Sequence, residues 1–246
     1  MAEKDILEKI LLSHADVFAD CENALCFGGV RKLDAGEMQP APTESFYQGR
    51  GRAHNQFCDI SFFRMKNGEI KAQYIIENET EPKRRQVLRK ASYQGGAYRA
   101  QLDLKNSVYP VVCMTLDWTR KRPFYPMSLK ELLAQDGAGD DELHLADDVK
   151  LTVYHMNHLS REVRSRFSSD MGFVVDYLNE GSFEGREGQK IIHAEALCDM
   201  MQALTGDARF TDLVDELLKR QKEGKEIVMC EYIDMLEARG EERGKK

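Results

Sequence analysis

The first part of the chain combines a helical pattern with two strand patterns. Apolar residues recur at helical spacing over residues 3–26, which predicts a helix with a break near Ser13 and His14. Residues 57–65 carry the β-branched and aromatic side chains typical of a strand, and residues 69–79 predict a returning strand. The Asn67-Gly68 dipeptide between them favours a tight turn, so these strands are expected to form a hairpin.

A helix and a buried strand are expected after the hairpin. Residues 83–104 predict a helix, although Gly95 and Gly96 weaken its middle. Residues 108–117 form a continuous apolar run, which is typical of a strand that is buried on both faces. A shorter strand is also expected near residues 44–48.

The rest of the chain predicts an acidic loop, one more strand and then helices. The loop covers residues 136–148, the strand covers residues 149–157, and every pattern from Ser160 onward is helical. The order α, β, β, β, α, β indicates an α/β class with a mixed core. We expect a core domain over residues 1–158 and an all-helical region over residues 159–246.

The composition supports a globular chain. Of 246 residues, 42% are hydrophobic and 31% are charged, which excludes a mainly disordered protein. No apolar run approaches the ~20 residues of a membrane helix, and the charged N-terminus lacks the apolar segment of a signal peptide. We therefore expect a cytoplasmic protein without a membrane partner. Six cysteines without a CxxC motif are expected to be buried thiols.

The charge is unevenly distributed along the chain. The net charge is -7, yet residues 41–125 contain 15 basic and 8 acidic residues. A basic middle section in an acidic protein indicates a local anionic partner, of which phosphate is the commonest. The alternative is a surface whose charge is uneven without any function.

Three acids near the predicted hairpin are the strongest candidate site. Glu77 and Glu79 are two residues apart on one strand and therefore project from the same face. Asp59 lies on the preceding strand. Three converging carboxylates suit a hard divalent cation such as Mg²⁺ or Mn²⁺. The alternative is an exposed hairpin end that carries acids without binding a metal.

The pairing register decides whether these acids can meet. A two-residue turn pairs residue 66 with residue 69 and places Asp59 opposite residue 76, facing away from Glu77. A three-residue loop, Asn67 to Glu69, pairs residue 66 with residue 70 and places Asp59 opposite Glu77. A shared acidic site therefore requires a G1-type bulge or an equivalent shift at this turn.

The helix after these strands is basic on one side. Residues 83–105 contain seven basic residues and one acid, and Arg85, Arg89 and Tyr93 share a face at i, i+4, i+8 spacing. Such a face beside an acidic metal site suits a phosphodiester, and we expect Arg89 and Tyr93 to point toward the acids. The alternative is an ordinary solvated helix face. Other basic residues could extend this surface, namely Lys90, Arg50, Arg52, Arg120, Lys121 and Arg122.

The pair His155-x-x-His158 gives a weaker signal. Its spacing does not suit one strand face, and no cysteine lies nearby, so a metal site is not indicated. We interpret these histidines as the structural end of a strand.

Several blocks together resemble the recombination-promoting nuclease and transposase family, a bacterial family of the PD-(D/E)xK nuclease superfamily. The likeness covers most of the chain, and its most specific parts are residues 77–80 and 98–102. Besides Asp59, the matching blocks are Asp16-Val17-Phe18-Ala19-Asp20 with Asn23, Ile75-Ile76-Glu77-Asn78-Glu79-Thr80, Leu88-Arg89 with Tyr93, Ala97-Tyr98-Arg99-Ala100-Gln101-Leu102, Tyr109-Pro110-Val111-Val112, Thr205-Gly206-Asp207-Ala208-Arg209-Phe210 and Met229-Cys230-Glu231.

The resemblance implies a restriction-endonuclease-like αβββαβ core and metal-dependent cleavage of DNA. Asp59 and Glu77 would bind Mg²⁺ or Mn²⁺, with Glu79 at the position of the superfamily lysine. Arg89 and Tyr93 would face the scissile phosphate. Asp20 or Asn23 would support the site from the first helix.

Glu79 departs from the pattern that the resemblance implies. The superfamily carries lysine at this position, and the family often carries glutamine. With Glu79 the site has three negative charges, which favours cation binding but removes the group that orients a water nucleophile. Reduced activity, use of two metal ions or loss of catalysis all remain open.

The sequence therefore predicts a metal-dependent DNA endonuclease with catalytic acids Asp59, Glu77 and Glu79. Arg85, Arg89, Lys90 and Tyr93 are the predicted DNA-binding residues. The main alternative is a catalytically inactive nuclease fold that binds DNA or protein, and a small-molecule enzyme is a third. The C-terminal helices could also pair two copies of the chain in a homo-oligomer.

Overall fold

A computed structural model describes residues 9–49, 52–81, 83–102, 104, 108–121, 125–183, 185–186 and 188–244. The chain forms two compact units. The sheet unit is Gly36–His155, and the helical unit combines the segment up to Ala35 with the segment from Met156 onward. These units divide the chain differently from the expected boundary after residue 158, because the first helix belongs with the C-terminal helices.

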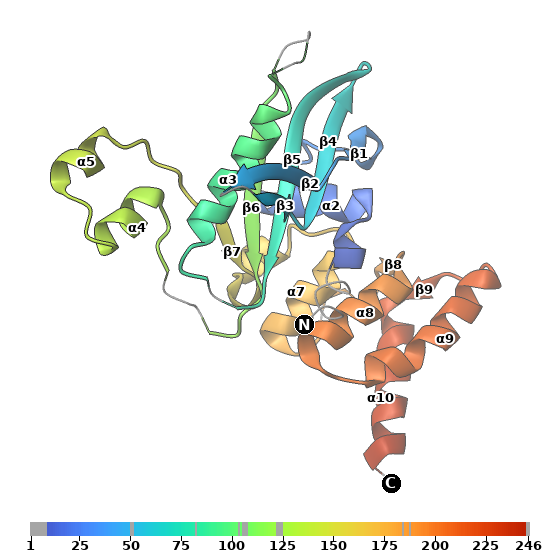
Figure 1. Ribbon diagram of the computed structural model, residues 1–246. Helices are drawn as coiled ribbons and strands as arrows, with labels where there is room; N and C mark the ends of the chain where they lie inside the picture. Colours follow the sequence, from blue (N-terminus) through green and yellow to red (C-terminus); the bar gives the residue numbers. More distant parts are fainter. Residues whose placement is uncertain are drawn as a thin grey trace. The chain divides into compact units, whose positions relative to one another are not determined.

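The sheet unit contains a mixed five-stranded sheet, so the expected α/β class with a mixed sheet is confirmed. The first three strands in the sheet order are antiparallel and the last three are parallel (Figure 1). In that order the strands are β1 (Met38–Pro40), β4 (Ile60–Lys66), β5 (Glu69–Glu79), β6 (Val111–Asp117) and β7 (Val153–His155).

Helix α3 (Gln86–Arg99) makes the crossover between the parallel strands β5 and β6. Parallel neighbours require such a crossover, because a tight turn joins only antiparallel strands. The helix packs on β6, and Tyr93 and Ala97 lie against Ile75 and Cys113 of the sheet. This packing determines which face of α3 is turned toward β5.

The sheet unit differs from the sequence expectation in four places, the first of which is the unexpected edge strand β1. Strand β2 (Glu44–Gly49) is confirmed, but it pairs with an unexpected strand, β3 (Arg52–Phe57), in a separate hairpin. The final strand is shorter than expected. The expected acidic loop contains helix α5 (Asp140–Leu145), which follows α4 (Leu129–Gln135); acids in the first turn of α5 interact favourably with the helix dipole.

The helical unit is built from helices and one short pair of strands. The break near Ser13 is confirmed, since residues 9–12 are helical and α2 begins again at Ala15. The expectation of an all-helical C-terminal region is wrong, because β8 (Lys190–Ile191) pairs with β9 (Ile227–Val228). The other elements are α2 (Ala15–Leu25), η2 (Met156–His158), α6 (Arg161–Arg164), α7 (Met171–Glu180), α8 (Ala194–Thr205), α9 (Arg209–Lys222) and α10 (Met229–Gly244).

Aromatic side chains fill the core of the helical unit. The rings of Tyr177 and Phe183 stack with centroids 5.0 Å apart, and Tyr177 meets Phe210 edge to face at 5.5 Å. Tyr232 of α10 contacts both Phe183 and Phe210. These contacts join α7, α9 and α10. Aromatic pairs of this geometry add stability beyond that of the area that they bury.

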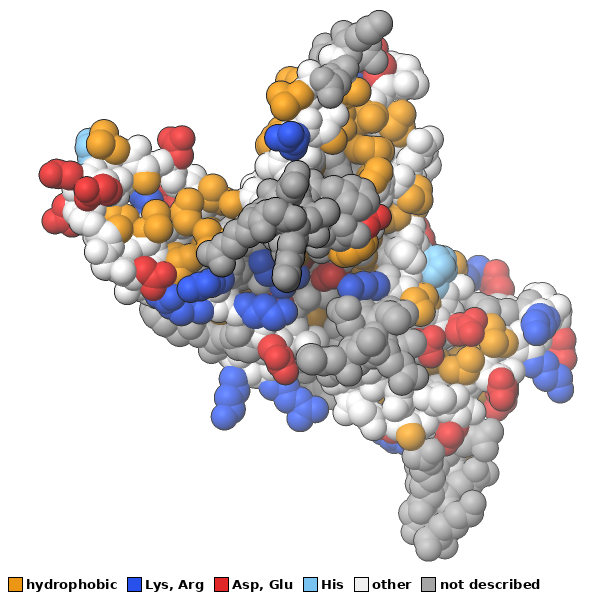
Figure 2. All heavy atoms as spheres, in the orientation of Figure 1, with side chains coloured by type: hydrophobic (Ala, Val, Ile, Leu, Met, Phe, Trp, Pro, Cys, Tyr) orange, Lys and Arg blue, Asp and Glu red, His pale blue; other side chains and the backbone are white. Residues whose placement is uncertain are grey.

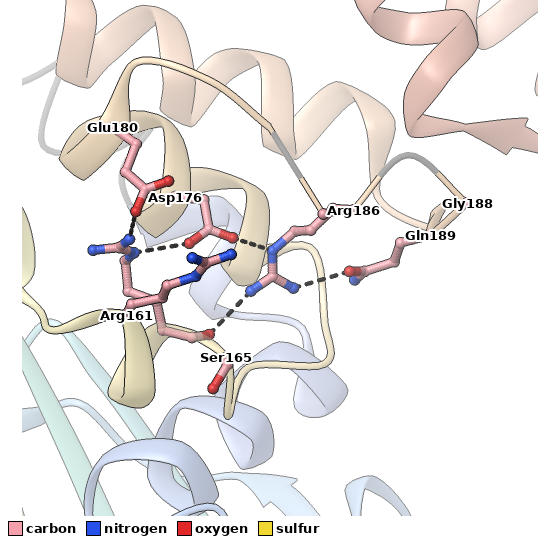
Figure 3. A pocket seen from close by; sticks show the side chains of 9 residues that line it. Arg161, Ser165, Asp176, Glu180, Arg186, Gly188 and Gln189 are labelled. Atoms are coloured by element: carbon pink, nitrogen blue, oxygen red, sulfur yellow. Dashed lines mark hydrogen bonds and ion pairs between the residues drawn. The ribbon is translucent and has the colours of Figure 1, made fainter.

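A buried ion-pair network stabilises the loop after α7 (Figure 3). Asp176 lies between Arg164, whose Nε donates to it at 2.9 Å, and Arg186, which donates to its second oxygen. Arg186 also donates to the carbonyl oxygens of Arg164 and Phe167. Both guanidinium groups are at most a tenth exposed and fully engaged, so the network is structural.

Among the described residues, no helix combines the length and the apolar character needed to cross a membrane. All six cysteines are free thiols. Four of them are buried as expected, whereas Cys26 is partly exposed and Cys230 is exposed.

Gly172 on α7 should be intolerant of any side chain. A Cβ there would meet the Arg186 guanidinium, with its Cζ at 2.5 Å, and would displace it from Asp176. We expect Gly172→Ala to cost about 1–3 kcal/mol, measured as a lower Tm in thermal denaturation. The matched control is Gly95→Ala on α3, where a Cβ meets nothing within 4 Å; it should stabilise by about 0.5–1 kcal/mol. Equal Tm values for the two variants would contradict this account.

Glu22 on α2 should make stability depend on pH. Its side chain is fully buried, and neither carboxylate oxygen has a hydrogen-bond partner among the described residues. Burial raises the pKa of Glu22 to about 8, and the Cys26 thiol opposes this only weakly. The folded state therefore retains a proton that the unfolded chain loses above its ordinary pKa of 4.5.

We expect the free energy of unfolding to fall as pH rises from about 4.5 to about 8, by up to ~1.4 kcal/mol per pH unit from this group. Glu22→Gln should reduce the slope by the contribution of Glu22, as measured by urea denaturation across the pH range, and leave the contribution of Glu77, whose pKa is also raised to about 8. The exposed Glu237→Gln is the control and should leave the slope unchanged. An unchanged slope in Glu22→Gln would show that Glu22 does not contribute to it.

Candidate functional site

A β-bulge in the β4–β5 hairpin places Asp59 level with Glu77. Asn67 and Gly68 form a two-residue turn in which both residues have positive φ, and Lys66 pairs with Glu69. The register then shifts between Arg64 and Met65, so that Ile60 pairs with Ile76. The shift that the acidic site requires is therefore present, two pairs beyond the turn rather than within it.

Hydrogen bonds from backbone N–H groups fix the carboxylates of Asp59 and Glu77. The N–H of Asp59 donates to Glu77 Oε1 at 3.0 Å, and the N–H of Asn78 donates to Asp59 Oδ2 at 2.7 Å. These reciprocal bonds keep the two carboxylates side by side at the end of β5. Asp59 is partly exposed, whereas only 3% of Glu77 is exposed.

Arg89 of α3 joins Glu77 to Glu79. Its Nη2 donates to Glu77 Oε2 at 3.2 Å, and its Nη1 donates to Glu79 Oε1 at 3.1 Å. The Tyr93 hydroxyl accepts from Arg89 Nε at 3.1 Å and from Nη2 at 2.9 Å, which orients the guanidinium. Arg89 and Tyr93 thus point toward the acids, as the helix spacing predicts.

Lys83 is a site residue that the sequence reasoning did not single out. Its Nζ lies 2.6 Å from Glu79 Oε1, at an i, i+4 separation. This separation was no usable signal in the sequence, because it pairs side chains on a helix, whereas Glu79 ends β5 and Lys83 precedes α3. Glu79 is therefore held by two cations, Lys83 and Arg89, which offset much of its negative charge.

Burial and a neighbouring charge shift the ionisation of the site. Burial, followed by the charge of Asp59, raises the pKa of Glu77 to about 8, while the Asp59 N–H and Arg89 act in the opposite direction. Burial and the charge of Glu77 also raise the pKa of the Tyr93 hydroxyl, which stays neutral near pH 7. A bound cation would favour the ionised form of Glu77.

The donor chemistry of Asp59 and Glu77 fits a hard divalent cation, since both supply carboxylate oxygens at one end of the sheet. Glu79 fits this role less well, because two cations, Lys83 and Arg89, already contact it, whereas Glu77 contacts only one, Arg89. Among the described residues, no three His, Cys, Asp or Glu side chains are arranged as a metal-binding group. Asp59 and Glu77 are thus the pair that would hold the cation.

The other predicted DNA-binding residues do not contact the acids. Arg85 is exposed and occupies the N-cap position of α3 without a side-chain capping bond, whereas Lys90 donates to the carbonyl of Lys150. In Figure 2, Lys and Arg side chains gather around the N-terminal end of α3. Arg120 and Lys121 are exposed, while Arg50, Arg122 and the side chain of Arg52 lie outside the described residues.

Asp20 and Asn23 belong to the helical unit and anchor its loops. Asp20 accepts from the N–H groups of Ser168 and Ser169, both at 2.9 Å, and from both hydroxyls at 2.7 Å. Asn23 bonds the backbone of residues 32–33 with both ends of its amide. Their predicted support of the acidic site stays a prediction.

A second polar pair lies along the same sheet edge. Asp117 stands opposite Glu79 in the β5–β6 ladder and opposite His155 in the β6–β7 ladder. Its Oδ2 lies 2.7 Å from His155 Nδ1, and only 1% of Asp117 is exposed. Burial and the charges of Asp117 and Glu79 raise the pKa of Tyr125 to about 12. Sequence reasoning treated His155 as the end of a strand, because its partner is distant in the chain.

Comparison with known proteins found no matching family model, no significantly similar curated protein and no significantly similar solved structure. The residues of this chain and their geometry are therefore the basis for the function proposed below.

Breaking the Arg89 bridge should destabilise the sheet unit. Arg89→Leu leaves Glu77 and Glu79 without their shared donor, and we expect a loss of about 1–3 kcal/mol in urea denaturation. Arg89 is a third exposed, so a double-mutant cycle with Glu79→Gln should give a coupling energy of only about 1 kcal/mol. Arg85→Leu on the same helix is the control and should change stability by less than about 0.5 kcal/mol. A coupling energy of zero would mean that Arg89 and Glu79 do not interact in solution.

Proposed function

We propose that this protein is a divalent-metal-dependent DNA endonuclease of the PD-(D/E)xK type, similar to the recombination-promoting nucleases and transposases. The observation that carries the proposal is the pairing of Asp59 with Glu77 at the end of β5, opposite Arg89 and Tyr93 of the crossover helix. A one-residue bulge creates this pairing, and the same hairpin without the bulge would separate the two carboxylates.

The proposed reaction is hydrolysis of a phosphodiester bond. A water oxygen bonds to phosphorus, the bond from phosphorus to one deoxyribose oxygen breaks, and that oxygen gains a proton. When bound by Asp59 and Glu77, a divalent cation supplies Lewis acidity and neutralises negative charge.

The side chains of this protein supply the remaining positive charge. Arg89 lies against Glu77 and has five N–H donors in a fork that suits phosphate oxygens. Lys83 brings an ammonium group to Glu79, the position where the superfamily carries lysine. We propose that Lys83, in the segment that leads from β5 into α3, replaces that lysine.

The second candidate is a nuclease fold that binds DNA or protein without cleaving. Its support is the engagement of Glu79 by Lys83 and Arg89, which leaves no three-carboxylate group for a metal among the described residues. The two candidates share the basic surface near α3 and differ in whether Asp59 is required for a chemical step.

Cleavage of plasmid and single-stranded DNA with Mg²⁺ or Mn²⁺ tests the proposal. We expect Asp59→Ala to abolish cleavage, because it removes one of the two carboxylates that would hold the cation. Glu79→Lys and Glu79→Gln should weaken metal binding yet maintain or raise the activity, since both restore residues that relatives carry. Lys83→Met should lower the activity of the wild type but have little effect beside Glu79→Lys. If the wild type and both Glu79 variants are all inactive, catalysis is rejected and the second candidate replaces it.

The salt dependence of binding separates DNA from protein partners. Phosphate contacts release counterions, so the logarithm of DNA affinity should fall steeply and linearly with the logarithm of salt concentration. Arg85→Ala should reduce that slope by about 1, whereas Glu237→Gln, an exposed residue of the helical unit, should not change it. A flat salt response would favour protein interaction.

A further inference from the structure

An open cavity of about 670 Å³ lies beside the carboxylate cluster, between the second half of α3 and strands β4 and β5. Its walls are largely apolar and aromatic. The rings of Phe63 and Tyr109 meet edge to face with centroids 5.8 Å apart, and Ile75 lies on the sheet side. Tyr93 also lines this cavity, and its hydroxyl accepts from Arg89. Tyr93 therefore belongs both to the cavity wall and to the acidic site.

Two polar groups in the cavity have unused hydrogen-bonding capacity. Gln73 is 6% exposed, and its Nε2 donates to Ser61 Oγ at 2.9 Å, but its Oε1 has no partner among the described residues. Whichever way the amide is turned, one of its two polar atoms stays unpaired. The Tyr109 hydroxyl likewise has no partner among the described residues, and burial raises its pKa. Neither atom is completely enclosed, so both are accessible to solvent and available to a ligand in this open cavity.

Two glycines of α3 keep the cavity open. Gly95 and Gly96 line it, and a Cβ at Gly95 would meet nothing within 4 Å. Each glycine inside a helix costs about 1 kcal/mol relative to alanine. Close packing at Gly95 does not explain why a glycine is present there. The space that the missing side chain leaves in the cavity does explain it.

The chemistry of the walls selects one kind of occupant. A planar aromatic ring can stack on the apolar and aromatic walls, and its polar edge can pair with Gln73 and Tyr109. Arg99 lies at the wall with an exposed guanidinium and no ion pair among the described residues, which suits a neighbouring phosphate. An aliphatic ligand would leave the Gln73 amide unpaired, and a free anion would meet mainly apolar atoms.

We propose that this cavity receives one unstacked nucleobase of the DNA strand that is bound at the Asp59–Glu77 pair. The inference rests on the proposed function, since it assumes a nucleic-acid substrate. It adds that the substrate must expose a base, so that mismatched, flexible or single-stranded segments are bound better than regular duplex.

The test uses DNA in which 2-aminopurine replaces several adenines, with a fluorescent dye at one end, as duplex and as single strand. Dye anisotropy reports binding, and 2-aminopurine fluorescence rises when the base leaves its stacked neighbours. The protein carries Asp59→Ala to prevent cleavage. In that background we compare Gly95→Leu, which fills the cavity, with Gly95→Ala, which leaves most of it open.

We expect a several-fold rise in 2-aminopurine fluorescence for the Asp59→Ala protein and for its Gly95→Ala variant. Gly95→Leu should remove the rise and weaken DNA binding at least about fivefold. If Gly95→Leu fails to fold, as judged by circular dichroism, Gln73→Met takes its place; it keeps the volume, removes the amide and should reduce the rise.

Three other results would count against the inference in different ways. DNA binding without any rise, or an equal rise in Gly95→Leu, overturns the base-binding cavity and leaves the proposed nuclease function standing. In a folded Gln73→Met variant, an undiminished rise does the same. Absence of both DNA binding and cleavage by the wild type overturns the proposed function together with the cavity.

Discussion

The candidate site depends on one extra residue in strand β5. The Asn67-Gly68 turn alone would pair Asp59 with residue 76 and direct its carboxylate to the other face of the sheet. The shift between Arg64 and Met65 restores the alignment with Glu77, and the two reciprocal backbone bonds then hold it. Every later feature of the site, including the approach of α3, is arranged around these paired carboxylates.

Burying that much negative charge requires compensation, and the crossover helix provides it. Glu77 and Glu79 are both nearly inaccessible, a placement that is costly for carboxylates without partners. Arg89 reaches both of them, Tyr93 fixes the position of Arg89, and Lys83 adds a second cation at Glu79. The same contacts that stabilise the sheet unit therefore concentrate positive charge where a phosphodiester would bind.

Local sequence signals predicted the hairpin, the crossover helix and the buried strand β6 of the sheet unit, but not their fine alignment. The hairpin follows from Asn67-Gly68, and α3 and β6 follow from their hydrophobic patterns. From the sequence, the bulge could be stated only as a condition for the acidic site. Lys71, the residue that the bulge leaves without a partner in the β4–β5 ladder, is an ordinary strand residue, and nothing in the sequence marks it. Asp117 and His155 escaped notice because they are 38 residues apart, and only the parallel ladder brings them together. The β8–β9 pair was missed because each of its strands is two residues long, which is too short to show a hydrophobic periodicity.

The bulge also limits how this chain can change in length. Deleting Lys71 would keep the turn, the strand and the hydrophobic face of β5, yet Asp59 would then pair opposite Ile76. A second change, the insertion of one residue into the turn, would restore the alignment. Related chains are thus free to move the extra residue between strand and turn but not to lose it, so gaps in this hairpin should occur in compensating pairs.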